Sequence, residues 1–257
     1  MQNDQISLVK IGGSTFAAGD TTLIDVSKLV LSGEKLVVVH GGGAAVNHWL
    51  NQLGVESQFL NGLRVTDQAT LEVVTGVLAG IVNKSLVIQL RASGVNAVGL
   101  SGVDGGLLTG SPLGSQFGNV AGEVESNPTI IFDLLKAGIT PVVAPLALNS
   151  IKANSYLNVN ADTAAGEIAR AIEAVKLVFM TDVDGILDNK GELIKTLSRN
   201  SIEDLIQEGV LSGGMIPKVS ACALAAEMGI VAAIINGTKN DALVSWFSGI
   251  DIGTSVV

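Results

Sequence analysis

The alternation of short apolar runs with segments of helical period is the feature that most constrains the fold of this chain. The runs are rich in apolar and β-branched residues and lie near Gly, Pro or Asp, which predicts strands at 6–11, 36–40, 97–100, 140–144, 177–181 and 230–235. Strands that are apolar throughout are buried on both faces, as in a parallel sheet covered by helices. The pattern therefore predicts an α/β fold with a mostly parallel sheet.

Helix signals lie between these runs. Residues 45–53 place Val46, Trp49, Leu50 and Leu53 on one side and stop at a glycine. Further helices are predicted at 127–138, 162–174, 201–209 and 218–228, and the Gly-rich stretch 101–125 predicts a hairpin or flap. No linker interrupts the chain, so we expect a single domain over 1–257, with a boundary near 175 between two lobes that share one sheet.

Composition limits the classes of partner. The formal net charge is −9, a poor match to nucleic acid or to an anionic bilayer. Apolar stretches such as 36–39 and 230–235 are far shorter than the roughly 18 residues of a spanning helix. The single cysteine, Cys222, excludes an intrachain disulfide or a Cys-based metal cluster, and the first residues lack the pattern of a signal peptide. We expect a cytoplasmic protein that binds neither membrane nor nucleic acid.

Two glycine motifs follow predicted strands. Lys10-Ile11-Gly12-Gly13-Ser14 combines a cation with glycines whose backbone N–H groups can approach an anion. His40-Gly41-Gly42-Gly43 leads into a helix, whose N-terminus favours negative charge. Neither motif is a Walker A loop or a dinucleotide fingerprint. The motifs predict anion sites, although a plain turn and a structural histidine explain the same residues.

Polar side chains in apolar surroundings mark the rest of the candidate site. Arg64 lies between Leu63 and Val65, where it can grip a carboxylate or form a surface ion pair. Asn158, Asn160 and Asp162 alternate in a predicted extended segment and would share one side, although Asp162 could also cap a helix. Asp182 to Leu187 offers acidic and backbone groups for a ribose, base or metal.

Lys218 follows Gly213-Gly214 at or beside a helix start. A cation is disfavoured near a helix N-terminus, so this departure from local preference suggests a function for Lys218. Two lysines, glycine loops and an aspartate are suited to phosphoryl transfer, which depends on positioning and charge neutralisation. The sequence contains no credible Ser-His-Asp set, no HExxH motif and no HRD and DFG pair, so the catalytic residues of proteases, esterases and protein kinases are missing. A carboxylate acceptor needs no catalytic base at neutral pH, so the sequence favours an acyl phosphate as product.

The chain resembles the amino acid kinase family through KIGGS, VVHGGG, NGLRVT, GLSGVDGG, LNVNAD, TDVDGIL, LSGGMIPKV and IDIGTSVV, in this order over nearly the whole length. The resemblance implies a three-layer αβα sandwich around an open, mainly parallel sheet. Residues 1–174 would hold the acceptor and 175–257 would hold ATP. The implied reaction phosphorylates the γ-carboxylate of N-acetyl-L-glutamate with magnesium ATP, in L-arginine biosynthesis.

The resemblance also assigns residues. Lys10 and Lys218 match transition-state lysines, and Asp162 matches the carboxylate that orients them. The acceptor would be held by Gly42, Gly43, Arg64 and Asn158. Nucleotide-binding positions would be Gly12, Gly13, Asp182, Val183, Asp184, Gly185, Ile186, Leu187, Val210, Leu211 and Ser212. No side chains are assigned as metal ligands.

Two alternatives and one regulatory expectation remain open at the level of sequence. A kinase for a related acid such as N-acetyl-α-aminoadipate, or a non-catalytic sensor of nucleotide or amino acid, would share many of these motifs. Arginine-inhibited hexameric relatives carry an additional N-terminal helix, whereas only five residues precede the strand that begins at Ile6. We therefore expect a homodimer without arginine feedback.

Overall fold

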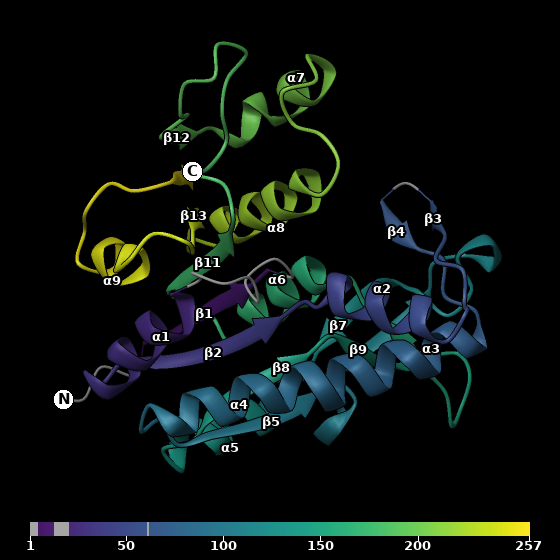
Figure 1. The fold of residues 1–257 in the computed structure, drawn as a ribbon. Coiled ribbons are helices and arrows are strands. Elements are labelled where there is room, and N and C mark those ends of the chain that lie inside the picture. Colours follow the sequence, from purple (N-terminus) through teal and green to yellow (C-terminus); the bar gives the residue numbers. More distant parts are fainter. Residues whose placement is uncertain (1–4, 13–20, 61) are drawn as a thin grey trace.

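The fold is organised around one eight-stranded sheet, shown in Figure 1 for the computed structural model, which describes residues 5–12, 21–60 and 62–257. The strand order is β12-β14-β13-β11-β1-β2-β8-β5. The bounds are β1 (Ile6–Ile11), β2 (Lys35–His40), β5 (Ala97–Ser101), β8 (Thr140–Ala144), β11 (Lys176–Thr181), β12 (Thr196–Leu197), β13 (Val231–Asn236) and β14 (Thr254–Val256). All six predicted strands are confirmed. Neighbours are parallel except β13 and β14, which are antiparallel.

Alternate residues of each central strand enter two different cores. Ile6 and Leu8 of β1 contribute to one core, while Val9 and Ile11 contribute to the other. In β2, Val37 and Val39 face the first core, and Leu36 and Val38 face the second. Burial on both faces explains why these strands read as continuous apolar runs.

One face of the sheet is covered by helices α1, α2, α3, α4 and α9 and by the π-helical segment η1. Their bounds are α1 (Thr22–Leu31), α2 (Gly43–Gln52), α3 (Gln68–Thr75), η1 (Gly76–Val82), α4 (Asn83–Ala92) and α9 (Ala242–Phe247). The other face is covered by α5 (Thr129–Lys136), α6 (Ala161–Ala171), α7 (Ile202–Gln207) and α8 (Met215–Glu227). This arrangement confirms the predicted three-layer αβα sandwich.

A second, four-stranded sheet lies beside this sandwich, in the order β10-β9-β6-β7. Its strands are β6 (Leu108–Pro112), β7 (Ala121–Ser126), β9 (Leu146–Asn149) and β10 (Tyr156–Asn158). β6 and β7 pair antiparallel, which confirms the hairpin predicted in the Gly-rich stretch. A third, two-stranded hairpin consists of β3 (Phe59–Leu60) and β4 (Leu63–Arg64), and short 3₁₀ turns occur at η2 (Asp104–Gly106), η3 (Ser115–Phe117) and η4 (Arg199–Ser201).

The sequence patterns missed α1, α9 and, above all, the continuous helical run Gln68–Ala92 formed by α3, η1 and α4. Its start carries a usable signal, because Asp67 caps the helix by accepting a hydrogen bond from the Thr70 N–H. Gly76, Gly80 and several β-branched residues within the run lower its helix propensity. Packing of Val74, Leu78 and Leu86 against the sheet overcomes this.

The run Gln68–Ala92 is 25 residues long and apolar enough to cross a membrane. The short apolar stretches at 36–39 and 230–235 gave no indication of it. A single helix of this kind is weak evidence for a membrane span, since core helices pass the same test. One side of it packs on the sheet, whereas Ile81 and Ile88 are exposed on the other.

Candidate active site

Lys10 is a buried cation at the carboxyl end of the central strand β1. It shares the face of Ile6 and Leu8, so its side chain enters the layer that contains α6. Only 4% of Lys10 is exposed, and its Nζ lies 2.6 Å from Oδ1 of Asp162. A lysine in this position needs such a partner, because burying an unpaired charge is costly.

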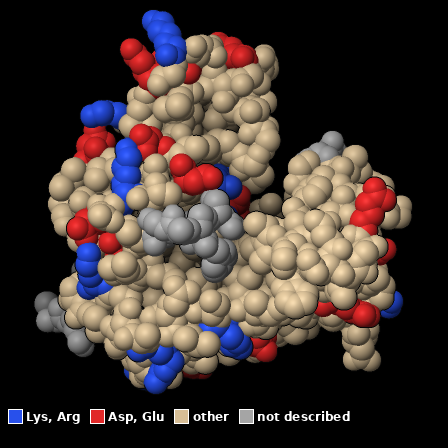
Figure 2. Space-filling model, in the orientation of Figure 1, with Lys and Arg blue, Asp and Glu red and all other residues tan. Residues whose placement is uncertain are grey.

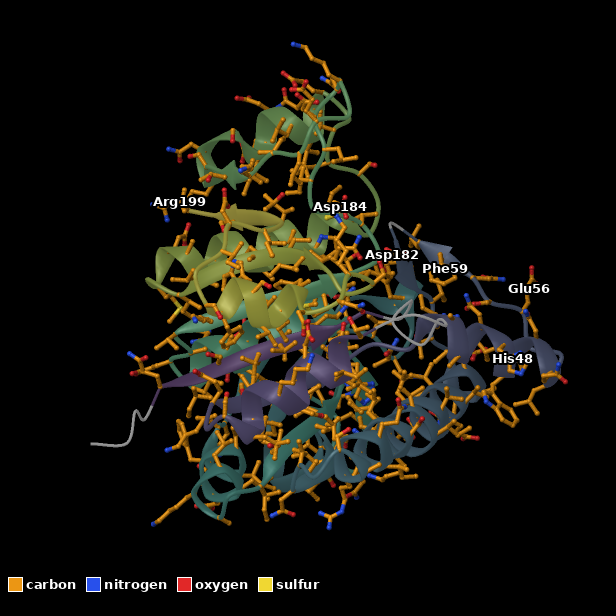
Figure 3. All side chains as sticks on the ribbon, turned by 60° about the vertical axis from the view of Figure 1, so that its left-hand side comes forward. His48, Glu56, Phe59, Asp182, Asp184 and Arg199 are labelled. Carbon is orange, nitrogen blue, oxygen red and sulfur yellow. The ribbon has the colours of Figure 1, made fainter. Side chains whose placement is uncertain are left out.

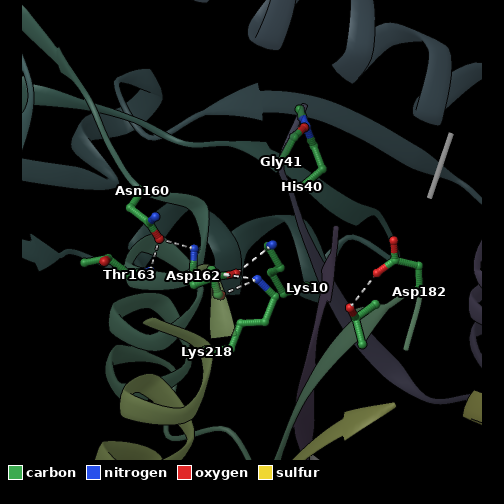
Figure 4. A network of polar contacts seen from close by, with 10 residues as sticks. Lys10, His40, Gly41, Asn160, Asp162, Thr163, Asp182 and Lys218 are labelled. Carbon is green, nitrogen blue, oxygen red and sulfur yellow. Dashed lines mark hydrogen bonds and ion pairs between the residues drawn. The ribbon is translucent and has the colours of Figure 1, made fainter. Parts of the chain in front are cut away.

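Asp162 lies in the first turn of α6, and Asn160 is the residue that caps this helix. The Asn160 side chain accepts hydrogen bonds from the N–H groups of Asp162 and Thr163. Asn158, Asn160 and Asp162 line the same cavity, as the predicted polar row requires, and Asn160 in addition caps the helix. Asp162, relieved of capping, is free to contact the two lysines (Figure 4).

Lys218 approaches Asp162 from the opposite side, out of the first turn of α8. Its Nζ lies 2.9 Å from Oδ2 of Asp162 and donates to the Gly214 carbonyl at 3.1 Å. The carboxylate compensates for placing a cation near a helix N-terminus. The helix begins at Met215, three residues earlier than predicted, and Lys218 lies in its first turn.

Within the Lys10–Asp162–Lys218 triad, the pKa values of Lys10 and Asp162 are shifted. Burial lowers the pKa of the Lys10 ammonium and outweighs the opposing attraction of Asp162. Burial also raises the pKa of the Asp162 carboxyl, but the two ammonium groups more than offset this, so its pKa lies below the ordinary value. Asp162 is therefore ionised at neutral pH, with one oxygen against each lysine.

The glycine motif after β2 lies beside this triad. Gly42 has φ = 158°, and a Cβ there would stand 2.6 Å from Leu78 Cδ2, so this position requires glycine. Gly43 begins α2 and lines the same space, so the N-terminus of this helix borders the cavity. Gly12 follows β1 and donates its N–H to the Met180 carbonyl, while Gly13 and Ser14 lie outside the described residues.

Arg64 and Asn158 border the same space. The Arg64 guanidinium donates to Asn47 Oδ1 at 2.7 Å and to the Ser57 hydroxyl, and it lies 4.7 Å from the centre of the Phe59 ring. These partners were not identified from the sequence, because they lie seven and seventeen residues away along the chain. Asn158 donates to the Thr66 hydroxyl at 3.2 Å.

A cavity of about 230 Å³ joins these groups. It is lined by Lys10, Gly41, Gly42, Gly43, Arg64, Asn158, Asn160 and Asp162, among others. Figure 2 shows this face of the molecule hollowed between the part that carries α7 and α8 and the part that carries the β3–β4 hairpin. Cations, glycine N–H groups and an amide therefore surround one small space, which suits a carboxylate beside a phosphoryl group.

The segment after β11 lies on the side of the C-terminal part that faces the Phe59 hairpin, where Figure 3 labels Asp182 and Asp184. Asp182 accepts a hydrogen bond from the Thr181 hydroxyl at 3.2 Å. Asp184 is held by Asn236 and Lys239, both at 2.7 Å, and the pKa of its carboxyl is lowered by these contacts. No motif in the sequence marks Asn236 or Lys239 as partners of Asp184.

The remaining predicted nucleotide positions differ in exposure. Val183 and Leu187 are exposed, and Gly185 has φ = 139°. Ile186 and Leu211 are buried in the core, and the Ile186 N–H donates to the Thr254 hydroxyl. Their side chains cannot face a nucleotide in this arrangement. Val210 packs on the same core, and Ser212 is exposed.

Comparisons with known proteins agree with this architecture. The model of the amino acid kinase family matches residues 5–236. Acetylglutamate kinase from Dehalococcoides mccartyi is 40% identical over 99% of this chain and 95% of its own length. Acetylglutamate kinase from Campylobacter hominis is 41% identical over 98% of this chain and 91% of its own.

Solved structures share the fold of this chain. The crystal structure of smu.665 from Streptococcus mutans covers 98% of each chain with a TM-score of 0.85 and 28% identity. Carbamate kinase from Giardia lamblia bound to AMP-PNP, at 16% identity and a TM-score of 0.69, shares the fold. From the family match, the full-length relatives and the fold, we conclude that this chain belongs to the amino acid kinase family.

Proposed function

We propose that this chain transfers the γ-phosphoryl group of ATP to the γ-carboxylate of N-acetyl-L-glutamate, giving N-acetyl-L-glutamyl 5-phosphate and ADP, an early step of L-arginine biosynthesis. The observation that carries the proposal is the buried Asp162, with Lys10 and Lys218 on its two oxygens, beside the cavity lined by Arg64 and the glycine loop. Full-length relatives that are called acetylglutamate kinase support the choice of acceptor.

The transfer needs no base. The acceptor carboxylate is ionised at neutral pH, so its oxygen attacks the γ-phosphorus directly while the bond to the β–γ bridging oxygen breaks and its electron pair leaves with ADP. In our proposal Lys10 and Lys218 stabilise the negative charge on the transferring group, and Asp162 holds both ammonium groups in place. Arg64 and Asn158 would hold the acceptor α-carboxylate.

Magnesium would enter with the nucleotide. Both oxygens of Asp162 face ammonium groups, and among the described residues that line the cavity Asp162 is the single carboxylate. Mg²⁺ prefers oxygen ligands, and the only carboxylate oxygens among these described residues are already paired with ammonium groups, so this donor set does not suit a protein-held Mg²⁺. Mg²⁺ is commonly carried by substrate phosphates instead. The ion would supply charge neutralisation on the β- and γ-phosphates.

The two lobes would divide the ligands. Apart from Lys218, the triad and cavity residues come from 1–174, and α8 supplies Lys218 from 175–257. Asp162 therefore connects the proposed acceptor lobe to the proposed ATP lobe. A small-molecule kinase with net charge −9 needs no nucleic acid or membrane partner, and its single cysteine fits the cytoplasm.

A panel of acceptors tests the substrate. ADP release from MgATP is measured with N-acetyl-L-glutamate, L-glutamate and N-acetyl-L-aminoadipate. We expect the highest kcat/KM with N-acetyl-L-glutamate. A preference for the aminoadipate would favour the related-kinase alternative, and ATP binding without turnover of any acceptor would favour the sensor.

Arg64→Ala is expected to raise the KM of the acceptor at least tenfold, with a much smaller change in the KM of ATP. Loss of a charged two-pronged hydrogen-bond donor removes about 1.5–3 kcal/mol of carboxylate binding. Steady-state kinetics with each substrate varied in turn measures the two constants. Arg199→Ala, which removes an exposed arginine paired with Glu227, is the control. Equal effects of Arg64→Ala on both constants would contradict the assignment.

We further propose a homodimer. Strand β5 is at one end of the sheet order, and the adjoining helical run exposes Ile81 and Ile88. Exposed apolar side chains beside a sheet edge favour burial against a second copy. Analytical ultracentrifugation is expected to show a dimer. In a kinetic assay, micromolar arginine is expected to leave turnover unchanged. A hexamer, or inhibition by arginine in that range, would be inconsistent with this proposal.

A further inference from the structure

His40 is a fully buried histidine that the proposed chemistry leaves without a role. It ends β2 and shares the face of Leu36 and Val38, so its ring enters the layer opposite Lys10, toward the long helical run. There it meets Asn83, which is also fully buried. Asn83 begins α4, immediately after the π-helical segment η1. Such π-helical insertions often occur at functional sites.

The contacts of Asn83 fix the proton on the His40 ring. Asn83 Nδ2 donates to the Val142 carbonyl at 2.8 Å and lies 3.1 Å from His40 Nε2, while Asn83 Oδ1 accepts from Lys84 Nζ at 2.9 Å. The amide cannot be reversed, since its oxygen would then face a carbonyl oxygen. His40 Nε2 must therefore accept, and the ring proton lies on Nδ1. Nδ1 is 2.8 Å from the Gly41 carbonyl oxygen, to which it donates.

This hydrogen bond sets the direction of the glycine loop. In a planar trans peptide the C=O and N–H groups point in opposite directions. With the Gly41 carbonyl drawn toward His40, the Gly42 N–H is turned away from the ring. Within the described part of the chain, the N–H groups of Gly42 and Gly43 have no hydrogen-bond acceptor, and both glycines line the cavity beside Lys10.

We propose that His40 is a positioning residue: its neutral ring, oriented by Asn83, holds the Gly41 carbonyl away from the cavity so that the Gly42 and Gly43 N–H groups point at the transferring phosphoryl group. This inference rests on the proposed function for the identity of that group. Leu78 and Val82 pack closely against the loop, since a Cβ on Gly42 would stand 2.6 Å and 3.3 Å from their side chains. Figure 4 shows His40 and Gly41 near the Lys10–Asp162–Lys218 triad.

The electrostatic surroundings keep the ring neutral. Burial lowers the pKa of His40 to about 4, and the ammonium groups of Lys10 and Lys84 act in the same direction, against the Gly41 carbonyl. Protonation would also place a second N–H against the Asn83 amide. The ring therefore keeps a single proton, on Nδ1, throughout the neutral pH range.

The tautomer is testable without substrate. The chain has two histidines, and His48 is exposed, so it serves as an internal reference in NMR spectra of the imidazole nitrogens and carbons. We expect His40 to be the neutral Nδ1–H tautomer from about pH 5 to 8. An Nε2–H tautomer, or a protonated His40 in this range, would overturn the inference.

Two substitutions separate the two hydrogen bonds. The side-chain amide nitrogen of asparagine is attached to Cγ, as Nδ1 is, whereas that of glutamine lies one bond further out, near Nε2. His40→Asn can therefore still donate to Gly41, and His40→Gln can contact Asn83 but not Gly41. We expect kcat to fall at least tenfold in His40→Gln and to remain within about threefold in His40→Asn, with smaller changes in either KM, because misaligned donors weaken only transition-state binding.

His48→Gln and His48→Asn are the matched controls and should behave as the unsubstituted chain. Equal turnover of the two His40 variants, or greater turnover of His40→Gln, would overturn the positioning role. If the chain turned over no acceptor, the proposed function would fail. The positioning role of His40 would still be tested by its tautomer and by the response of the Gly42 and Gly43 amide resonances to MgATP. Unchanged amide resonances at saturating MgATP would contradict it.

Discussion

Lys218→Ala is expected to lower kcat by roughly 10²-fold or more, with a smaller effect on the KM of either substrate. Lys218 contributes a positive charge whose partner in the absence of substrate is Asp162, at 2.9 Å. The charge that develops on the transferring phosphoryl group is largest in the transition state. Removing the ammonium therefore affects turnover more than binding.

Lys195→Ala provides the matched control for this experiment. Lys195 lies in the same C-terminal part, but it is exposed and pairs with Asp251 on the surface. Its removal should leave kcat unchanged, because surface ion pairs contribute little. Near-normal turnover in Lys218→Ala would remove Lys218 from the catalytic triad.

Asp162→Asn is expected to lower both turnover and stability. The substitution leaves Lys10, which is 4% exposed, without its carboxylate, and breaking a buried pair by removing one partner costs about 3–5 kcal/mol. Turnover should fall by roughly 10²-fold, since neither lysine remains oriented. Urea unfolding and steady-state kinetics measure the two effects. A variant as stable and as active as the unsubstituted chain would contradict this account.

The pH dependence of this stability difference has a defined sign. The pKa of Asp162 is lower in the folded chain than in the unfolded chain, so its ionised form stabilises the fold above the unfolded pKa. That stabilisation is lost as pH falls through the folded value. The difference in free energy of unfolding between the unsubstituted chain and Asp162→Asn should therefore be constant from about pH 5 to 8 and become smaller only below about pH 4. A gap that closes near neutral pH would contradict the shifted pKa.

The sheet and the positions at its carboxyl edge were predictable because local pattern determines them. The continuous apolar character of β1, β2, β8 and β11 reports burial on both faces, and residues that follow such strands gather at one edge. This edge is where Lys10 and the glycine loop lie. Asp162 could be identified as polar and close to a helix start, although Asn160 and not Asp162 is the cap.

The sequence could not predict features that depend on contacts between distant segments. The pairing of Asp162 with Lys218 joins positions 56 residues apart, and the His40–Asn83 contact joins positions 43 apart. Local composition argued against the run Gln68–Ala92, whose glycines and β-branched residues disfavour a helix until the sheet supplies a surface. Asn83 was not recognised for the same reason, since its importance depends on what surrounds it.

Trapping of the product with hydroxylamine tests the central claim most directly. Hydroxylamine converts an acyl phosphate to a stable hydroxamate, so the reaction is incubated with MgATP and N-acetyl-L-glutamate, and the hydroxamate is compared with the ADP formed. We predict equal amounts of both, dependent on the acceptor and lost in Lys218→Ala. ADP release without hydroxamate, or no reaction in a chain that still binds ATP, would contradict phosphoryl transfer to a carboxylate.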